Sequence, residues 1–111
     1  AYSIMHMDWA RSLCDITRAG ENITIGILSD SFDSSSLVDE PSRSAEDVAF
    51  GYLPGPKNPY RYTTPVQVLE DSMGTDEGRA MAQLVHAFLP HAKICFATAS
   101  NGETAFAANI L

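Results

Sequence analysis

Segments with helical spacing alternate with short β-branched segments along nearly the whole chain of 111 residues. The helical segments place apolar side chains every third or fourth residue, which is the spacing of one helix face. The predicted elements, in order, are a helix over Met5–Ile16, a strand over Asn22–Leu28, a helix over Ser44–Tyr52, a strand over Val66–Leu69, a helix from Thr75 or Asp76 to about Phe88, a strand over Ala92–Ala99 and a helix after Asn101-Gly102. Strands that alternate with helices pair in parallel through right-handed crossovers, so this order predicts an α/β fold with a parallel sheet.

The first predicted strand indicates how the sheet would be covered. Its residues from Ile23 to Leu28 are apolar apart from Thr24 and Gly26. A run of this kind is typical of a strand inside a parallel sheet with helices on both faces, so we expect a three-layer arrangement. An α/β sheet usually has more than three strands. We therefore expect residues 1–111 to form the N-terminal part of a larger domain, with at least one open sheet edge.

The segment 34–65 interrupts the alternation of helices and strands, and we interpret it as an insert. It is rich in serine at its start and contains four prolines between residues 54 and 65. Because proline lacks an N–H group and restricts the residue before it, the second half predicts an extended surface loop. Within the insert, Ser44 is expected to cap the short helix, with Asp47 three residues further on.

Composition argues against several classes of function. The net charge is −7 and the seven Lys and Arg residues do not cluster, so we expect no nucleic-acid partner. No apolar run approaches the roughly 20 residues that a membrane span needs. Cys14 and Cys95 lack a metal-binding pattern; each lies in an apolar run, which favours a small buried side chain, with a Cys14–Cys95 disulfide as the alternative. No loop has the oxygen-ligand spacing of a calcium site, so no metal is expected.

Polar segments follow all three predicted strands, at the edge where open parallel sheets place their chemistry. They read SDSFD, EDSMGTDEG and ASNGE. Asp30 stands at the end of the first strand, and Glu77 stands at the start of a helix. Both acids also have ordinary roles open to them, because aspartate caps loops and acids favour the first turn of a helix.

These segments resemble the N-terminal part of the subtilisin-like serine peptidases. GENITIGILSDSFD resembles the first strand of the family's core, which ends in Asp-Ser, and HMDWARSLCDI resembles the helix before it. DEGRAMAQLVHAFLPHAKICFATA is similar to a segment of one divergent branch, in which a helix begins at a catalytic position, ends at a proline and leads into a strand. GETAFAANI resembles the start of the next helix. The resemblance covers most of the chain, and the insert at 34–65 is its most variable part.

The resemblance implies a catalytic role for Asp30. In the family an aspartate at this position orients the catalytic base, and here Ser31 follows Asp30 as the family motif has it. Phe32 stands where the family usually has glycine, so the local turn must differ. The nucleophilic serine and the asparagine of the oxyanion hole are expected after Leu111.

Glu77 falls at the position of the base when Gly78 is aligned with the glycine of the family's His-Gly-Thr-His motif. The usual base is therefore replaced. The sedolisins, a related group of acid-active serine peptidases, also have glutamate at this position, but their aspartate four residues later is Met81 here. Two neighbouring carboxylates repel, so one of them holds a proton to higher pH. If Asp30 and Glu77 meet, we expect a shared proton and mildly acidic activity.

The resemblance also implies the partners of the site. The substrate would be a peptide or protein whose backbone contacts Thr98, Ser100 and Asn101 after the third strand, and the second partner would be the remainder of the peptidase domain. No cofactor is implied. Most members of the family act outside the cytoplasm, so an extracellular or periplasmic location is expected.

Two other functions stay open. A non-catalytic α/β binding or interaction module on the same scaffold would explain why the base histidine and the nucleophile are missing. A nucleotide-binding or receiver-type domain is disfavoured, because SDSFDSSS lacks the glycines of a phosphate loop.

Overall fold

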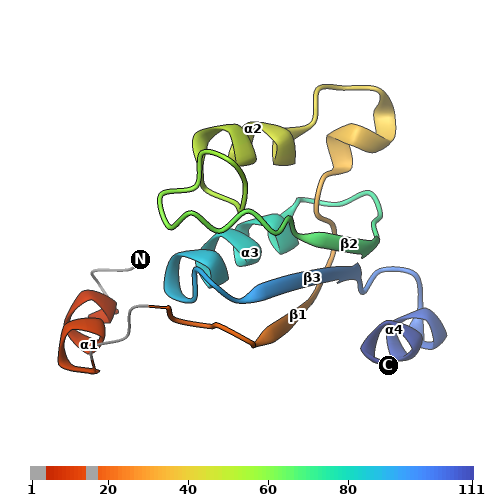
Figure 1. Ribbon diagram of the computed structural model, residues 1–111. Coiled ribbons are helices and arrows are strands. Elements are labelled where there is room, and N and C mark those ends of the chain that lie inside the picture. Colours follow the sequence, from red (N-terminus) through yellow and green to blue (C-terminus); the bar gives the residue numbers. More distant parts are fainter. Residues whose placement is uncertain (1–4, 15–17) are drawn as a thin grey trace.

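The computed structural model describes residues 5–14 and 18–111 and confirms the α/β fold (Figure 1). Its elements are α1 (Met7–Cys14), β1 (Thr24–Ser29), the 3-10 helix η1 (Ser34–Val38), α2 (Arg43–Phe50), β2 (Gln67–Glu70), α3 (Glu77–Phe88), β3 (Lys93–Thr98) and α4 (Glu103–Ile110). The order of helices and strands is the predicted one, with η1 added in the serine-rich part of the insert. The predicted end of the first helix, at Ile16, lies outside the described residues.

The three strands form one parallel sheet in the order β1-β3-β2. Residues Thr24–Ser29 pair with Lys93–Thr98, and β2 pairs with the other side of β3 through an irregularity between Val68 and Glu70. β1 therefore lies at an edge, and its predicted position inside the sheet was wrong. An apolar run indicates that side chains are buried, whereas the crossovers decide which strand is central.

Helices lie on both sides of this sheet. α3 packs against β1 and β3, with α2 beyond it on the same side, while α4 packs against β3 near its carboxyl end (Figure 1). Cover over β1 is uneven, because Ile27 is buried whereas Thr24 and Gly26 are exposed. The expectation of a strand covered along both faces therefore holds for only part of β1.

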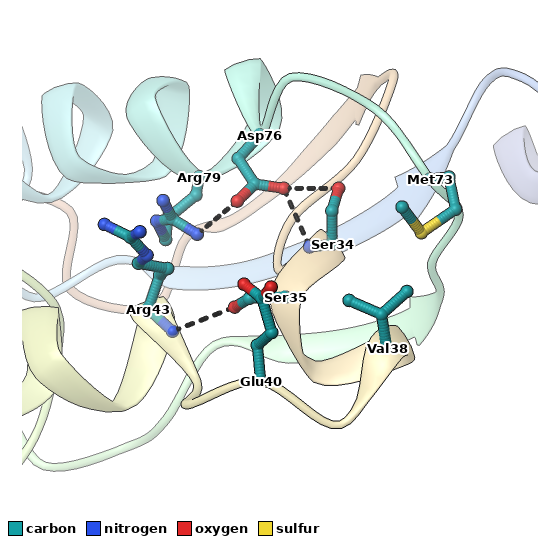
Figure 2. Close-up of a pocket in the computed structure, with 8 residues that line it drawn as sticks. All are labelled: Ser34, Ser35, Val38, Glu40, Arg43, Met73, Asp76 and Arg79. Carbon is teal, nitrogen blue, oxygen red and sulfur yellow. Dashed lines mark hydrogen bonds and ion pairs between the residues drawn. The ribbon is translucent and has the colours of Figure 1, made fainter.

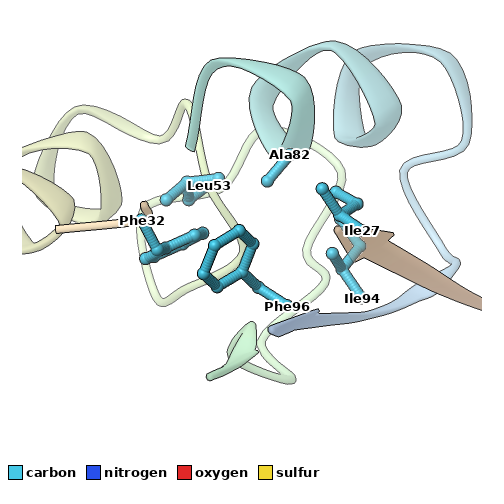
Figure 3. Close-up of a cluster of buried hydrophobic side chains, with 6 residues drawn as sticks. All are labelled: Ile27, Phe32, Leu53, Ala82, Ile94 and Phe96. Carbon is cyan, nitrogen blue, oxygen red and sulfur yellow. The ribbon is translucent and has the colours of Figure 1, made fainter. Parts of the chain in front are cut away.

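The hydrophobic core lies between α3 and the sheet. Its buried members are Ile27, Phe32, Leu53, Ala82, Ile94 and Phe96 (Figure 3). The rings of Phe32 and Phe96 pack with their centroids 5.4 Å apart. Leu53 comes from the proline-rich half of the insert and is 1% exposed. The prediction of a surface loop was therefore wrong for this part of the insert, which supplies a core side chain.

The start of α2 also differs from the prediction. Ser42, not Ser44, is the N-cap, and its hydroxyl oxygen accepts the N–H of Ala45 at 3.1 Å. The backbone of Ser42 is extended, which is the conformation that an N-cap requires, whereas Ser44 is already inside the helix. Two nearby serines cannot be told apart by spacing alone.

Two further expectations concern cysteine and the membrane. Cys95 is a free, half-buried thiol, and the Cys14 side chain, the other half of the alternative disulfide, lies outside what the structure describes. In the part of the chain that the structure describes, no helix is long and apolar enough to cross a membrane.

Candidate active site at the carboxyl edge of the sheet

The carboxyl end of β1 meets the start of α3 at one edge of the sheet. Asp30 directly follows β1, and Glu77 is the first residue of α3. Asp30 Oδ1 accepts the backbone N–H of Glu77 at 3.1 Å and that of Ser31 at 2.6 Å. Its Oδ2 accepts the N–H and the hydroxyl of Thr75 at 2.5 and 2.6 Å. Residues 47 positions apart in the sequence are thus brought into direct contact.

Hydrogen bonds hold Asp30 in its ionised form. The hydroxyl and the backbone N–H of Thr75 are the main donors that lower the pKa of Asp30 to about 2, against the opposing effect of burial. The backbone N–H groups of Ser31 and Glu77 lower this pKa further. Among the described residues the two carboxylates form no hydrogen bond with each other. The arrangement does not contain the shared proton that we expected from the sequence.

Glu77 is exposed, but one of its carboxylate oxygens is held in place. Oε2 accepts the hydroxyl of Ser29 at 3.2 Å, and Ser29 is 8% exposed at the end of β1. No other hydrogen bond to the Glu77 side chain is formed by the residues that the structure describes, so Oε1 is unpartnered there. The side chain thus combines an anchored oxygen with one that can accept a proton.

Close packing explains why α3 can start beside Asp30. The N–H of Gly78 donates to the carbonyl oxygen of Ser31 at 3.0 Å, which ties the helix to the loop after β1. A Cβ at position 78 would overlap the ring of Phe96 and lie 2.7 Å from that carbonyl oxygen. The glycine that aligned Glu77 with the family motif is therefore required by packing.

Two further aspartates fasten the loop after β1 to the loop before α3. Asp71 accepts the N–H groups of Phe32 and Asp33 at 2.8 and 2.9 Å. Asp76 Oδ1 accepts the N–H of Ser34 at 2.8 Å. The sequence interpretation missed Asp71, although its place just after β2, at the same carboxyl edge, was a signal.

The network continues from Asp33 to Arg79. Burial raises the pKa of Asp33, but hydrogen bonds outweigh it and lower the pKa to about 2. The donating hydroxyls belong to Ser42, Ser35 and Ser44. Arg79 pairs with three carboxylates, those of Asp76 at 2.7 Å, Asp47 at 3.0 Å and Asp33 at 3.8 Å. Charge-assisted bonds of this kind fix α2 and α3 to the loop that carries Asp30.

A pocket of about 310 Å³ adjoins this network (Figure 2). Its lining comes from the insert, the loop before α3 and α3 itself: Ser34, Ser35, Val38, Glu40, Arg43, Met73, Asp76 and Arg79. Asp76 lines the pocket, whereas Asp30 and Glu77 do not. The pocket is therefore a concave surface beside Asp76 and Arg79, with charges of both signs on its walls.

The three predicted substrate contacts differ in accessibility. Thr98 is fully buried, and its hydroxyl donates to the carbonyl oxygen of Asp30 at 2.7 Å. Its side chain therefore supports the loop and is not available to a substrate. Ser100 and Asn101 are exposed at the same edge, with the Asn101 amide donating to Glu70 at 2.6 Å.

Comparisons with protein-family models, with curated proteins and with solved structures found no match for this chain. The described residues also contain no cluster of His, Cys, Asp and Glu that could hold a metal ion. The chemistry that Asp30 and Glu77 can offer is proton transfer and charge stabilisation by carboxylates.

Proposed function

We propose that this chain carries the catalytic base Glu77 and its supporting residue Asp30 of a subtilisin-like serine endopeptidase in which glutamate replaces the base histidine. The observation that supports this most directly is the 3.1 Å hydrogen bond from the Glu77 N–H to Asp30 Oδ1. It joins the two positions that the family resemblance selects, at the carboxyl edge of a parallel sheet. Ligand sites of open α/β sheets lie at this edge.

In this proposal Glu77 is the general base. Oε1 would take the proton of the serine hydroxyl as its oxygen attacks the peptide carbonyl, and the protonated Glu77 would return that proton to the leaving amine. The serine would come from residues that follow Leu111. Asp30 would act as the anchor of the helix start, since it binds the backbone N–H of Glu77. A group that first takes and then returns a proton works best near its own pKa, and carboxyl groups ordinarily titrate in the acidic range, so peptide or protein substrates would be cleaved under mildly acidic conditions, outside the cytoplasm.

A second function is favoured by the way in which Asp30 is bonded. Both of its oxygens are occupied by donors from Ser31, Thr75 and Glu77. A carboxylate bonded in this way can fasten loops without taking part in catalysis. In that case the same scaffold would act as a non-catalytic binding module, with the pocket beside Asp76 as its contact surface.

The test is peptide cleavage by the full-length protein between about pH 3 and pH 8. Replacing Glu77 by Gln removes the base and should lower kcat by about 10²–10⁴-fold. Glu103→Gln is the matched control, because Glu103 is also an exposed glutamate at the first position of a helix. Equal kcat for Glu77→Gln and the wild type would exclude Glu77 as the base, and absence of cleavage in the wild type would favour the binding module.

A further inference from the structure

The Glu77 side chain would be poorly positioned without a partner. It lies at the first residue of α3, is exposed, and has several side-chain torsions that solvent leaves free. A general base has to lie within hydrogen-bond reach of the proton that it takes, in a narrow range of directions. An unconstrained glutamate at this position would spend much of its time outside that range.

Ser29 constrains the position of the Glu77 side chain. Its hydroxyl donates to Glu77 Oε2 at 3.2 Å, and within the described part of the chain it is the one side chain bonded to this carboxylate. Ser29 closes β1, pairs with Thr98 of the central strand and is 8% exposed, so the rigid sheet fixes its backbone. The donor therefore lies on a regular strand, and the acceptor belongs to a long, exposed side chain.

From this geometry we infer that Ser29 is a positioning residue, which holds Glu77 Oε2 so that Oε1 is presented to the substrate side of the site. The inference rests on the proposed function and extends it by one residue. Ser29 would neither touch the substrate nor exchange a proton with it.

The experiment compares kcat and KM of the full-length wild type with Ser29→Ala and Ser29→Thr across the acidic range. Ser29→Ala should lower kcat by roughly tenfold, the scale of one hydrogen bond to a charged group, with KM changed by less than about twofold. Ser29→Thr keeps the hydroxyl and should restore most of the rate. Ser12→Ala is the control, because Ser12 is an exposed serine whose hydroxyl is bonded only to a backbone carbonyl.

A second measurement separates this inference from the proposed function. Vicinal coupling constants of the Glu77 side chain, measured by NMR in the 111-residue chain, report whether one rotamer dominates. We expect a dominant rotamer in the wild type and averaged values after Ser29→Ala, with Glu103 averaged in both. Averaged couplings for Glu77 in the wild type, or an unchanged kcat for Ser29→Ala in an active enzyme, would overturn the role of Ser29. Ordered couplings in a protein without peptidase activity would refute the proposed function and leave Ser29 as a structural anchor of Glu77.

Discussion

Aspartate side chains order the loops at the carboxyl edge of the sheet, residue by residue. Asp30, Asp71 and Asp76 each accept N–H groups from the opposite loop. A buried backbone N–H without an acceptor costs about 1–3 kcal/mol, so these side chains provide what regular structure cannot provide in a loop. The acidic residues around the site therefore stabilise its loops, in addition to the catalytic role that we propose.

The protonation state of His86 also follows from the residues around it. It lies on α3, is 2% exposed, and its Nε2 is hydrogen-bonded to the Asn58 amide nitrogen. Asn58 Oδ1 accepts the N–H of Tyr60, which fixes the orientation of that amide. Since the amide nitrogen can only donate, Nε2 must accept, and the ring proton lies on Nδ1. Burial, with a smaller effect of His91, lowers the pKa of His86 to about 4.

This shift predicts a loss of stability in acid. His86 titrates near 6.5 when unfolded and near 4 when folded, so the unfolded state binds the proton first as the pH falls. The free energy of unfolding should be highest above pH 6.5 and should decrease until about pH 4, because below that value both states are protonated. Asp30 and Asp33, whose pKa values drop from 3.8 to about 2, add a further loss below pH 3.8.

Urea unfolding followed by circular dichroism between about pH 8 and pH 3 measures this dependence. His86→Gln should flatten the curve between pH 6.5 and pH 4, whereas His6→Gln, at an exposed position, should leave it unchanged. A wild-type curve that is flat over this interval would show that His86 is not buried as a neutral ring.

At the scale of elements, the contact between α3 and the strands positions the site. Gly78 lets the first turn of α3 lie directly on Phe96 of β3, with the N–H of Gly78 bonded to Ser31. A larger residue would push the helix start, and Glu77 with it, away from Asp30. Alanine is a better helix former than glycine by about 1 kcal/mol. Helix propensity therefore favours alanine at position 78, whereas packing favours glycine.

Gly78→Ala is expected to destabilise the chain by about 1–3 kcal/mol, because overpacking outweighs the gain in helix propensity. Gly26→Ala is the matched control: a Cβ at this strand glycine meets no atom within 4 Å. Its effect should stay within about 0.5 kcal/mol. Urea unfolding of both variants at neutral pH gives the comparison, and a Gly78→Ala variant as stable as the wild type would contradict the tight contact.

At the scale of the whole molecule, β1 is an apolar strand with one edge left unpaired by the residues that the structure describes. The carbonyl oxygens of Ile23 and Ser29 accept the N–H groups of Lys93, at the start of β3, and of Ala99, just after its end, which shows which residues of β1 face β3. In a parallel pair, successive residues point their backbone groups to opposite sides, so Thr24, Gly26 and Leu28 face away from β3. An edge of this kind is a template for another strand.

Amide hydrogen exchange should reveal this asymmetry in the 111-residue chain. The amides of Thr24, Gly26 and Leu28 are expected to exchange about a hundredfold faster than those of Cys95 and Ala97 in the central strand, because they lack a partner. The measurement is made at low protein concentration and repeated at higher concentration. If the amides of Thr24, Gly26 and Leu28 were as well protected as those of Cys95 and Ala97 at both concentrations, the outer edge of β1 would already be paired.

Local patterns predicted the elements well and the site in part. Helical spacing, β-branched runs and strand ends located α1 to α4 and the three strands, but not the 3-10 helix η1, and they placed Asp30 and Glu77 at the same edge. Ser42 as the cap of α2, the burial of Leu53 and the role of Asp71 were missed. The burial of Leu53 and the role of Asp71 depend on contacts with residues far away in the chain, such as Phe32 for Asp71, which sequence spacing does not reveal. The cap at Ser42 depends on the local backbone conformation, and spacing did not distinguish it from Ser44.

The sequence by itself determined the type and order of the elements, because periodicity and turn chemistry act over a few neighbouring residues. Only the tertiary structure decided that β1 lies at an edge, that Thr98 is buried, and that Thr75 and Ser29 are the donors to Asp30 and Glu77. These features arise when segments more than 40 residues apart meet at one edge of the sheet. Their energies depend on three-dimensional contact and burial, which no local pattern encodes.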